Sequence, residues 1–259
     1  KEGQLLDPTW FDSEGKFYGV FEGVEQGQLK LTLEVELGAG QDKKRVTLDE
    51  VYITLKDVRD MYRFINVRKG PTMGTDDGLL RYRNKEESKQ IFAPDSTRVL
   101  IWAHGYNNTL EGSAGSADIV YKRLYQTGFR GSFIFISWDT ADWIQPFSAA
   151  NFNGDWVNSF RSARITADII KDIRTAYPGA RIDLGAHSLG NSLMCYALRL
   201  LAREGSAPID NLIMAEPAVP GEVFCGLSRK PYDLLGFRYN FFDNMYGRSV
   251  DAVRGKIYN

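Results

Sequence analysis

The sequence predicts an α/β fold: a doubly wound, mainly parallel sheet that is preceded by a small β-rich region. From residue 98 onward, short apolar runs alternate with stretches of helical periodicity, which is typical of parallel strands joined by crossover helices. Before residue 68, apolar and polar residues alternate instead, as they do in strands with one solvated face. At 259 residues, 43% of them hydrophobic, the chain can bury the core of one large domain and carry an appendage.

The β-rich region, residues 1–67, is expected to contain an antiparallel hairpin. Residues 28–37 and 46–55 alternate apolar with polar side chains, and the residues between them favour a turn. Residues 17–21 and 61–67 are further candidate strands.

Two interpretations of this region compete. Residues 68–97 are rich in Gly, Pro, Asp and Lys, which favours a linker between a separate β module and a domain at residues 98–259. A separate module could bind a surface or a protein partner. The alternative is a structural extension of the main sheet, either as antiparallel strands at its edge or as a cover over that edge.

The domain at residues 98–259 is expected to alternate strands and helices. The strands are expected at residues 98–103, 132–138, 181–186 and 211–215, and the helices at residues 117–127, 157–177 and 191–204. In such sheets, ligands bind beyond the carboxyl ends of the strands. His104, Trp138, Ser188 and Glu216 all fall at such ends, so we expect them to lie near one site.

The segment Ala-His-Ser-Leu-Gly at residues 186–190 has the pattern of a nucleophile elbow. A serine on a sharp turn between a buried strand and a helix needs small neighbours two positions away on each side, and Ala186 and Gly190 supply them. The turn exposes the Ser188 hydroxyl, and the helix that follows presents backbone N–H groups to a developing oxyanion. Ser188 is therefore the predicted nucleophile.

A second motif, His-Gly-Tyr-Asn-Asn-Thr at residues 104–109, follows the first apolar strand of the domain. The backbone N–H of Tyr106 is expected to join that of Leu189 in an oxyanion hole, which acyl transfer requires. His104 directly precedes the glycine of this loop, so it is expected to fix the loop instead of acting as the base. His187 lies inside the elbow, where its side chain cannot easily turn back onto Ser188.

These motifs, together with Phe-Ile-Ser-Trp-Asp-Thr at residues 135–140 and with Asp155 and Ser162, resemble a bacterial α/β-hydrolase family of largely unknown function. Its members read HGYN, then a strand ending in FSWPS, then AHSMGN. This sequence departs from them at Asp139-Thr140, and at Glu216, where relatives often carry Pro-Asp. The resemblance covers about residues 98–259 and implies a serine hydrolase of the esterase or lipase type. His104, Gly105, Trp138, His187 and Gly190 would then support or line the site.

The sequence has no histidine after Ser188, although the chain order in this fold is serine, acid, histidine. We expect an incomplete copy of a hydrolase that lacks its C-terminal acid and histidine segment. Two alternatives stay open: an inactive binding or scaffold module, and an enzyme that uses His104 or a carboxylate as an unusual base. Glu216 is a candidate for the acid, or a residue that only shapes the site.

Composition excludes several other functions. A formal net charge of −1 gives no electrostatic case for nucleic acid. Two cysteines and two histidines, scattered along the chain, predict neither a metal site nor a disulfide framework. No Gly-rich phosphate loop follows a predicted strand, so we expect no cofactor. The sequence lacks an apolar run of about eighteen residues and a signal-like N-terminus. The compartment, cytoplasmic or not, stays open.

Aromatic clusters suggest a pocket for a small-molecule ester. One cluster follows the second strand of the domain, and a second one precedes residue 247; the residues are Trp143, Ile144, Phe147, Phe152 and Trp156, and Tyr232, Phe237, Tyr239, Phe241, Phe242 and Tyr246. They could accommodate an acyl or aryl group, or they could simply be core.

Overall fold

The computed structural model divides the chain into two compact units, Lys1–Asp57 and Val58–Asn259. It describes residues 7–14, 25–38, 44–68, 97–140, 149–206, 208–219, 246 and 249–258.

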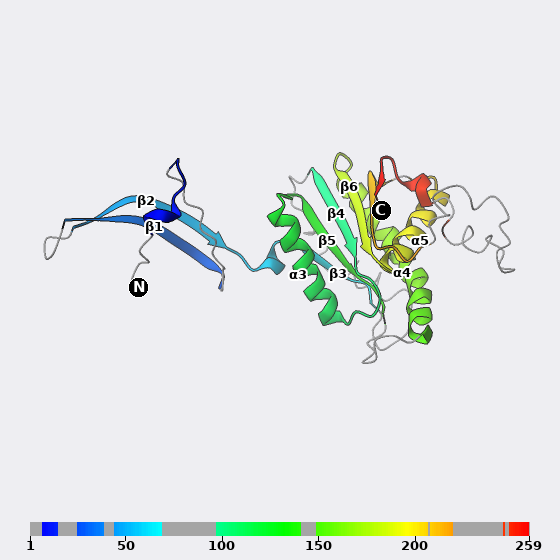
Figure 1. Cartoon of the computed structure of the whole chain (residues 1–259). Coiled ribbons are helices and arrows are strands. Elements are labelled where there is room, and N and C mark those ends of the chain that lie inside the picture. Colours follow the sequence, from blue (N-terminus) through cyan, green and yellow to red (C-terminus); the bar gives the residue numbers. More distant parts are fainter. Residues whose placement is uncertain are drawn as a thin grey trace. The chain divides into compact units, whose positions relative to one another are not determined.

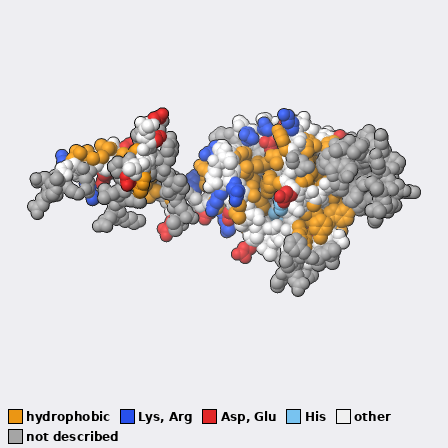
Figure 2. All heavy atoms as spheres, viewed as in Figure 1, with side chains coloured by type: hydrophobic (Ala, Val, Ile, Leu, Met, Phe, Trp, Pro, Cys, Tyr) orange, Lys and Arg blue, Asp and Glu red, His pale blue; other side chains and the backbone are white. Residues whose placement is uncertain are grey.

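The first unit contains the predicted antiparallel hairpin, formed by β1 (Gly27–Leu37) and β2 (Lys44–Leu55). Residues directly opposite each other share a face, so the register places Leu29 with Ile53 and Leu31 with Val51 on an apolar face. This face is solvent-exposed: Leu31 is 45% and Val51 is 51% exposed. Apolar side chains are visible along the hairpin in Figure 2. A role for the hairpin in binding a partner stays a prediction.

The opposite face of the hairpin is polar and carries ion pairs between Lys30 and Glu50 and between Arg45 and Glu34. The short helix η1 (Pro8–Trp10) also belongs to this unit. The strand predicted at residues 17–21 lies outside the described residues.

The second unit is built on a six-stranded sheet in the order β3-β5-β4-β6-β7-β8, with every pair parallel (Figure 1). The strands are β3 (Arg63–Asn66), β4 (Arg98–Ala103), β5 (Ser132–Ser137), β6 (Arg181–His187), β7 (Asn211–Ala215) and β8 (Ile257–Tyr258). The predicted α/β class with a mainly parallel sheet is therefore confirmed.

Strand β3 lies within residues 61–67, for which the sequence left open a separate module or an extension of the main sheet. It pairs in parallel with β5, and the Phe64 ring stacks on the Phe135 ring at a centroid distance of 5.7 Å. Ile65 packs into the core on the other face of the sheet. Both faces of this short strand are thus covered by apolar neighbours, so it belongs to the larger sheet. The division of the chain into two units accordingly falls between Asp57 and Val58.

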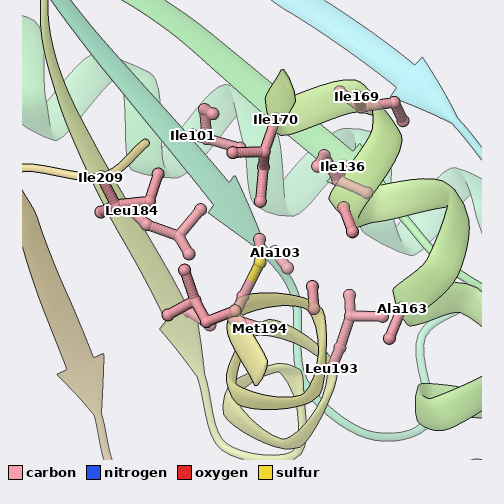
Figure 3. Packing of buried hydrophobic residues seen from close by; sticks show 14 of the residues in the cluster. Ile101, Ala103, Ile136, Ala163, Ile169, Ile170, Leu184, Leu193, Met194 and Ile209 are labelled. Carbon is pink, nitrogen blue, oxygen red and sulfur yellow. The ribbon is translucent and has the colours of Figure 1, made fainter. Parts of the chain in front are cut away.

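Helices cover both faces of the sheet. Alternation along β4 explains the two layers: Val99, Ile101 and Ala103 point into the core beneath α4 (Ala149–Ala176) and α5 (Gly190–Arg203), while Leu100 packs on the side of α3 (Leu110–Gln126). Figure 3 shows strand residues such as Ile101 and Leu184 facing helix residues such as Met194. Short helices η3 (Val58–Asp60) and η6 (Ser249–Ala252) complete the described elements.

Helices α3 and α4 begin earlier than their apolar periodicity indicates. In α3 the start is set by a cap, because the Thr109 hydroxyl accepts a hydrogen bond from the Gly112 N–H at 2.9 Å. Within the described parts of the chain, no helix combines the length and the apolar composition needed to cross a membrane.

Candidate active site

Among the described residues, three that are not glycine have a positive φ, and all three follow the carboxyl ends of neighbouring strands. Asn107 (φ 53°) follows β4, Ser188 (φ 49°) follows β6 and Glu216 (φ 46°) follows β7. Since β4, β6 and β7 are adjacent, the three residues lie at one edge of the sheet. The left-handed region costs a residue with a side chain about 1–2 kcal/mol, so surrounding contacts must impose it. This edge is the candidate site.

The backbone of Ser188 is held from two sides. Its N–H donates to the Ala215 carbonyl at 2.9 Å, which ties it to the end of β7. Its carbonyl accepts from the N–H groups of Asn191 and Ala218, each at 3.1 Å. These hydrogen bonds from β7, its following loop and α5 impose the strained conformation of the turn between β6 and α5.

Asn191 is a supporting residue that the sequence analysis did not single out. Its side chain is fully buried, and its Nδ2 donates to the carbonyls of Ala186, Ser188 and Ala215 at 3.1, 3.0 and 3.3 Å. One amide thus joins β6, the serine turn and β7. The signal was present, because Asn191 directly follows Gly190 in the elbow motif.

Two glycines allow the loop after β4 to approach the elbow. A Cβ on Gly105 would lie 3.0 Å from the Ser188 Cβ and 2.9 Å from the His187 Nδ1. A Cβ on Gly190 would overlap the carbonyl oxygen of His104. The two motifs, more than 80 residues apart in sequence, are therefore in direct contact, as their predicted cooperation requires.

The N–H groups predicted as oxyanion donors belong to these two segments. Within the described residues, neither the Tyr106 N–H nor the Leu189 N–H donates to an acceptor. The Leu189 side chain is fully buried, which anchors the start of α5, and the Tyr106 ring contacts the Phe152 ring at a centroid distance of 5.6 Å. Their role as oxyanion donors stays a prediction.

His104 is buried behind the loop, and both of its ring nitrogens have backbone partners. The Trp138 N–H donates to His104 Nε2 at 3.1 Å, so the proton resides on Nδ1, which donates to the Gly105 carbonyl at 2.8 Å. The Trp138 indole stacks on the imidazole at 5.4 Å and donates from Nε1 to the His104 carbonyl at 2.8 Å. His104 thus has no nitrogen left for Ser188.

The environment of His104 also keeps it neutral. Burial lowers the pKa of His104 from 6.5 to about 4. A histidine of such low basicity is a poor proton acceptor near neutral pH, in agreement with the loop-fixing role expected from sequence.

His187 and Glu216 lie together at the surface beside Ser188. The His187 Nε2 is 3.4 Å from a Glu216 carboxylate oxygen, and their side chains are 51% and 87% exposed. Within the described residues, no hydrogen bond joins the Ser188 hydroxyl to either histidine. The structure thus brings Ser188, His187 and Glu216 to one edge without connecting them in a triad.

Two further charged residues approach the loop after β4 and were not assigned to the site from sequence. Arg68, placed in the predicted linker, is only 7% exposed and donates to the Asn108 carbonyl of the loop. Asp155 on α4 is 1% exposed and accepts from the Asn107 N–H at 3.4 Å. Only Asp155 had a sequence signal, since it was one of the residues behind the family resemblance.

The aromatic residues predicted to line a pocket separate into two kinds. Phe152 is 40% exposed beside Tyr106, as a pocket wall would be. Trp156 instead packs edge-on against Phe160 and donates to the Tyr246 hydroxyl at 2.8 Å, which places it in the core. The others, Trp143, Ile144, Phe147, Tyr232, Phe237, Tyr239, Phe241 and Phe242, lie outside the described residues.

No group of histidine, cysteine or carboxylate side chains in the described part of the chain could hold a metal ion. Cys195 is fully buried in α5, and burial raises the pKa of its thiol to about 12, so it is unreactive.

A parallel sheet wrapped by helices on both faces, with a strained serine between β6 and α5, defines an α/β-hydrolase fold. The chain belongs to the family described as alpha/beta hydrolase of unknown function (DUF900), whose model matches residues 83–232, more than half of its length.

Several solved structures are similar at low identity. A Trichoderma reesei cutinase bound to a phosphonate inhibitor is 16% identical, with 47% of this chain and 52% of the cutinase covered and a TM-score of 0.32. An acetylxylan esterase is 13% identical, covers 62% of this chain and 81% of its own, and has a TM-score of 0.36. The metagenomic carboxylesterase EstE1 is 15% identical, with 88% and 63% covered and a TM-score of 0.32. The chain thus spans about half the length of the cutinase. No protein of curated function matches it significantly.

Proposed function

We propose that the protein is a serine hydrolase that cleaves carboxylic esters through an acyl-enzyme on Ser188. The observation that carries this proposal is the strained turn at Ser188, held by backbone hydrogen bonds and packed against a loop whose Tyr106 N–H has no described acceptor. Strain of this kind persists where surrounding structure maintains it for function.

In the proposed reaction, Ser188 Oγ attacks the ester carbonyl carbon while its proton passes to a base. The new C–O bond places negative charge on the carbonyl oxygen, which the N–H groups of Tyr106 and Leu189 stabilise together with the N-terminus of α5. The alcohol leaves with the proton, and water then hydrolyses the acyl-serine by the same route in reverse.

Neither histidine, as the structure places it, supplies that base. His104 already uses both ring nitrogens, and the described contact of the His187 ring is with Glu216. The exposed carboxylate of Glu216 favours a role in shaping the mouth of the site over one as the orienting acid of a triad. Because neither histidine is placed as a base, a second candidate function is a hydrolase-fold binding module without turnover.

Small esters with short or medium acyl chains are the proposed substrates. The support is local: the Tyr106 ring and the partly exposed Phe152 ring lie side by side next to the proposed oxyanion donor, where an acyl group would lie.

Hydrolysis of p-nitrophenyl esters from acetate to octanoate by the full natural chain tests the proposal. Ser188→Ala should lower kcat about a thousandfold or more, because removing a catalytic serine removes the covalent route. Ser206→Ala, at the opposite end of α5, is the matched control and should leave kcat unchanged. Wild-type protein that hydrolyses none of these esters, or no faster than Ser188→Ala, would contradict the proposal and favour the binding module.

A further inference from the structure

A buried guanidinium lies behind the loop that carries the proposed oxyanion donor. Arg68 lies two residues beyond the end of β3 and is only 7% exposed. Its Nη1 donates to the Asn108 carbonyl at 2.7 Å and to the Trp138 carbonyl at 3.3 Å, and its Nη2 donates to the Thr140 carbonyl at 2.7 Å. These acceptors lie 40 to 72 residues away in the chain, on the segments that follow β4 and β5.

Because the guanidinium is buried, it needs these hydrogen bonds in place of water. A charge removed from water costs several kcal/mol unless hydrogen bonds compensate for it. Arginine can satisfy several carbonyls at once, because its donors form a rigid planar fork, whereas a lysine ammonium is a compact point charge. The positions of the carbonyls of Asn108, Trp138 and Thr140 are therefore linked through one side chain.

Thr140 also holds the backbone of Asn108, the residue of the loop that Arg68 contacts. Its hydroxyl donates to the Asn108 carbonyl at 2.7 Å and accepts from the Asn108 N–H at 3.2 Å. The Asn108 side chain then donates to the Tyr106 carbonyl at 3.1 Å. Arg68 is thus connected to the backbone of Tyr106 through Asn108.

The loop is held from both ends by these contacts. His104 and Gly105 fix its beginning against β5 and the elbow, and Arg68 with Thr140 fixes its end. Between the two anchors, Asn107 has the left-handed backbone conformation. A displacement of the outer anchor would therefore move the Tyr106 N–H.

We infer that Arg68 is a positioning residue for the proposed hydrolysis: through Asn108 it holds the Tyr106 N–H at the angle that stabilises the oxyanion. The inference rests on the proposed function, and it predicts an effect on turnover and not on substrate binding. Loss of one oxyanion donor costs about 10²–10³ in kcat, which sets the upper limit for a misplaced one.

The chain offers a matched control in Arg174 on α4. Its guanidinium also bridges backbone carbonyls, those of Ala180 at 2.7 Å and of Pro208, and it pairs with Asp210. These partners lie around the amino ends of β6 and β7, at the edge of the sheet opposite the candidate site.

The experiment compares Arg68→Lys, Arg68→Ala and Arg174→Lys with the wild type in the full natural chain. It measures Tm, and it measures kcat and KM for the p-nitrophenyl ester that the wild type hydrolyses fastest. Arg68→Lys should lower kcat about tenfold to a hundredfold with KM changed less than about threefold. Arg174→Lys should lower Tm to a similar extent and leave kcat within about twofold. Added guanidinium ions should restore at least a tenth of the lost kcat to Arg68→Ala by entering the vacated space.

The outcomes separate the two proposals. If Arg68→Lys lowers kcat no more than Arg174→Lys does, or if guanidinium restores nothing to Arg68→Ala, Arg68 is only structural and this inference is overturned. If the wild-type chain neither turns over esters nor reacts at Ser188, the proposed function fails, and the inference fails with it.

Discussion

The loop after β4 and the end of β6 each carry one of the two histidines of the chain, and the two side chains have opposite environments. His104 in the loop is 3% exposed, stacked on Trp138 and bonded at both ring nitrogens. His187 at the end of β6 is half exposed and contacts an exposed carboxylate. Burial and hydrogen bonding therefore distinguish the two imidazoles.

The segments that carry the two histidines differ as well. The loop is densely packed and fixed by Arg68 and Thr140, which suits backbone donors that must not move. The turn is strained at Ser188, which suits a side chain that must stay exposed to react. Changes in the loop should therefore lower stability first, while changes in the turn should lower activity first.

The largest expected effect on stability is the pH dependence that His104 introduces. Because burial lowers its pKa from 6.5 to about 4, only the unfolded state gains the proton as pH falls below 6.5. Its contribution to stability is full above pH 6.5 and is lost progressively down to about pH 4, a loss of about 3 kcal/mol.

Urea unfolding of wild type and His104→Asn between pH 7 and pH 4 measures this contribution. Carboxylates titrate in both proteins, so their contribution to the pH dependence of stability cancels when one curve is subtracted from the other. The variant should be less stable at pH 7 and should lose less stability on acidification. Parallel curves would show that His104 is protonated as readily in the folded as in the unfolded protein.

Gly190→Ala should break the contact between the loop and the elbow. The added methyl group would overlap the His104 carbonyl, so the free energy of unfolding should fall by about 2 kcal/mol, and ester hydrolysis should fall with it. The control is Gly115→Ala in α3, where a Cβ meets nothing within 4 Å. That change should stabilise the protein by about 0.5–1 kcal/mol. Equal effects of the two substitutions would contradict the described packing.

Ser188→Gly and Ser188→Ala should separate strain from chemistry. Both remove the hydroxyl and should abolish hydrolysis, but only glycine adopts the left-handed conformation without a penalty. Thermal unfolding should find Ser188→Gly about 1 kcal/mol more stable than Ser188→Ala. A glycine variant that is less stable than the alanine variant would mean that the turn is not strained.

The smallest expected effect belongs to His187→Gln. The side chain is exposed and its contact with Glu216 is a surface pair, so stability should change by less than about 0.5 kcal/mol. Turnover should stay within about threefold, because a general base contributes 10²–10⁴ and His187 is not placed as one. A hundredfold loss of kcat without a loss of stability would instead identify His187 as the base.

The elements predicted best from sequence were those whose pattern is local. Alternation specified the β1–β2 hairpin, and apolar runs separated by helical periodicity specified the parallel sheet. For strand β3 the sequence left two interpretations open, a separate module or an extension of the main sheet, because four residues beside a hairpin carry no sign of which sheet they join. That choice depends on Phe64 meeting Phe135, about 70 residues further along the chain.

The residues of the candidate site that could be predicted were also those with a local sequence signal. Ser188, Tyr106 and Glu216 could be placed at strand ends because motifs mark those ends. Arg68 could not be found, since a buried arginine in a charged, Gly-rich stretch looks like a solvated one until its distant carbonyl partners are known. The base that the proposed reaction requires was the weakest point of the prediction, and no described histidine supplies it.

The most direct test of the account is intact-protein mass spectrometry of the full natural chain before and after treatment with a fluorophosphonate, followed by peptide mapping. The account predicts one phosphonyl adduct on Ser188, absent from Ser188→Ala and present in the Ser206→Ala control. A chain that stays unlabelled, or whose adduct maps to another residue, would contradict the assignment of Ser188 as the nucleophile.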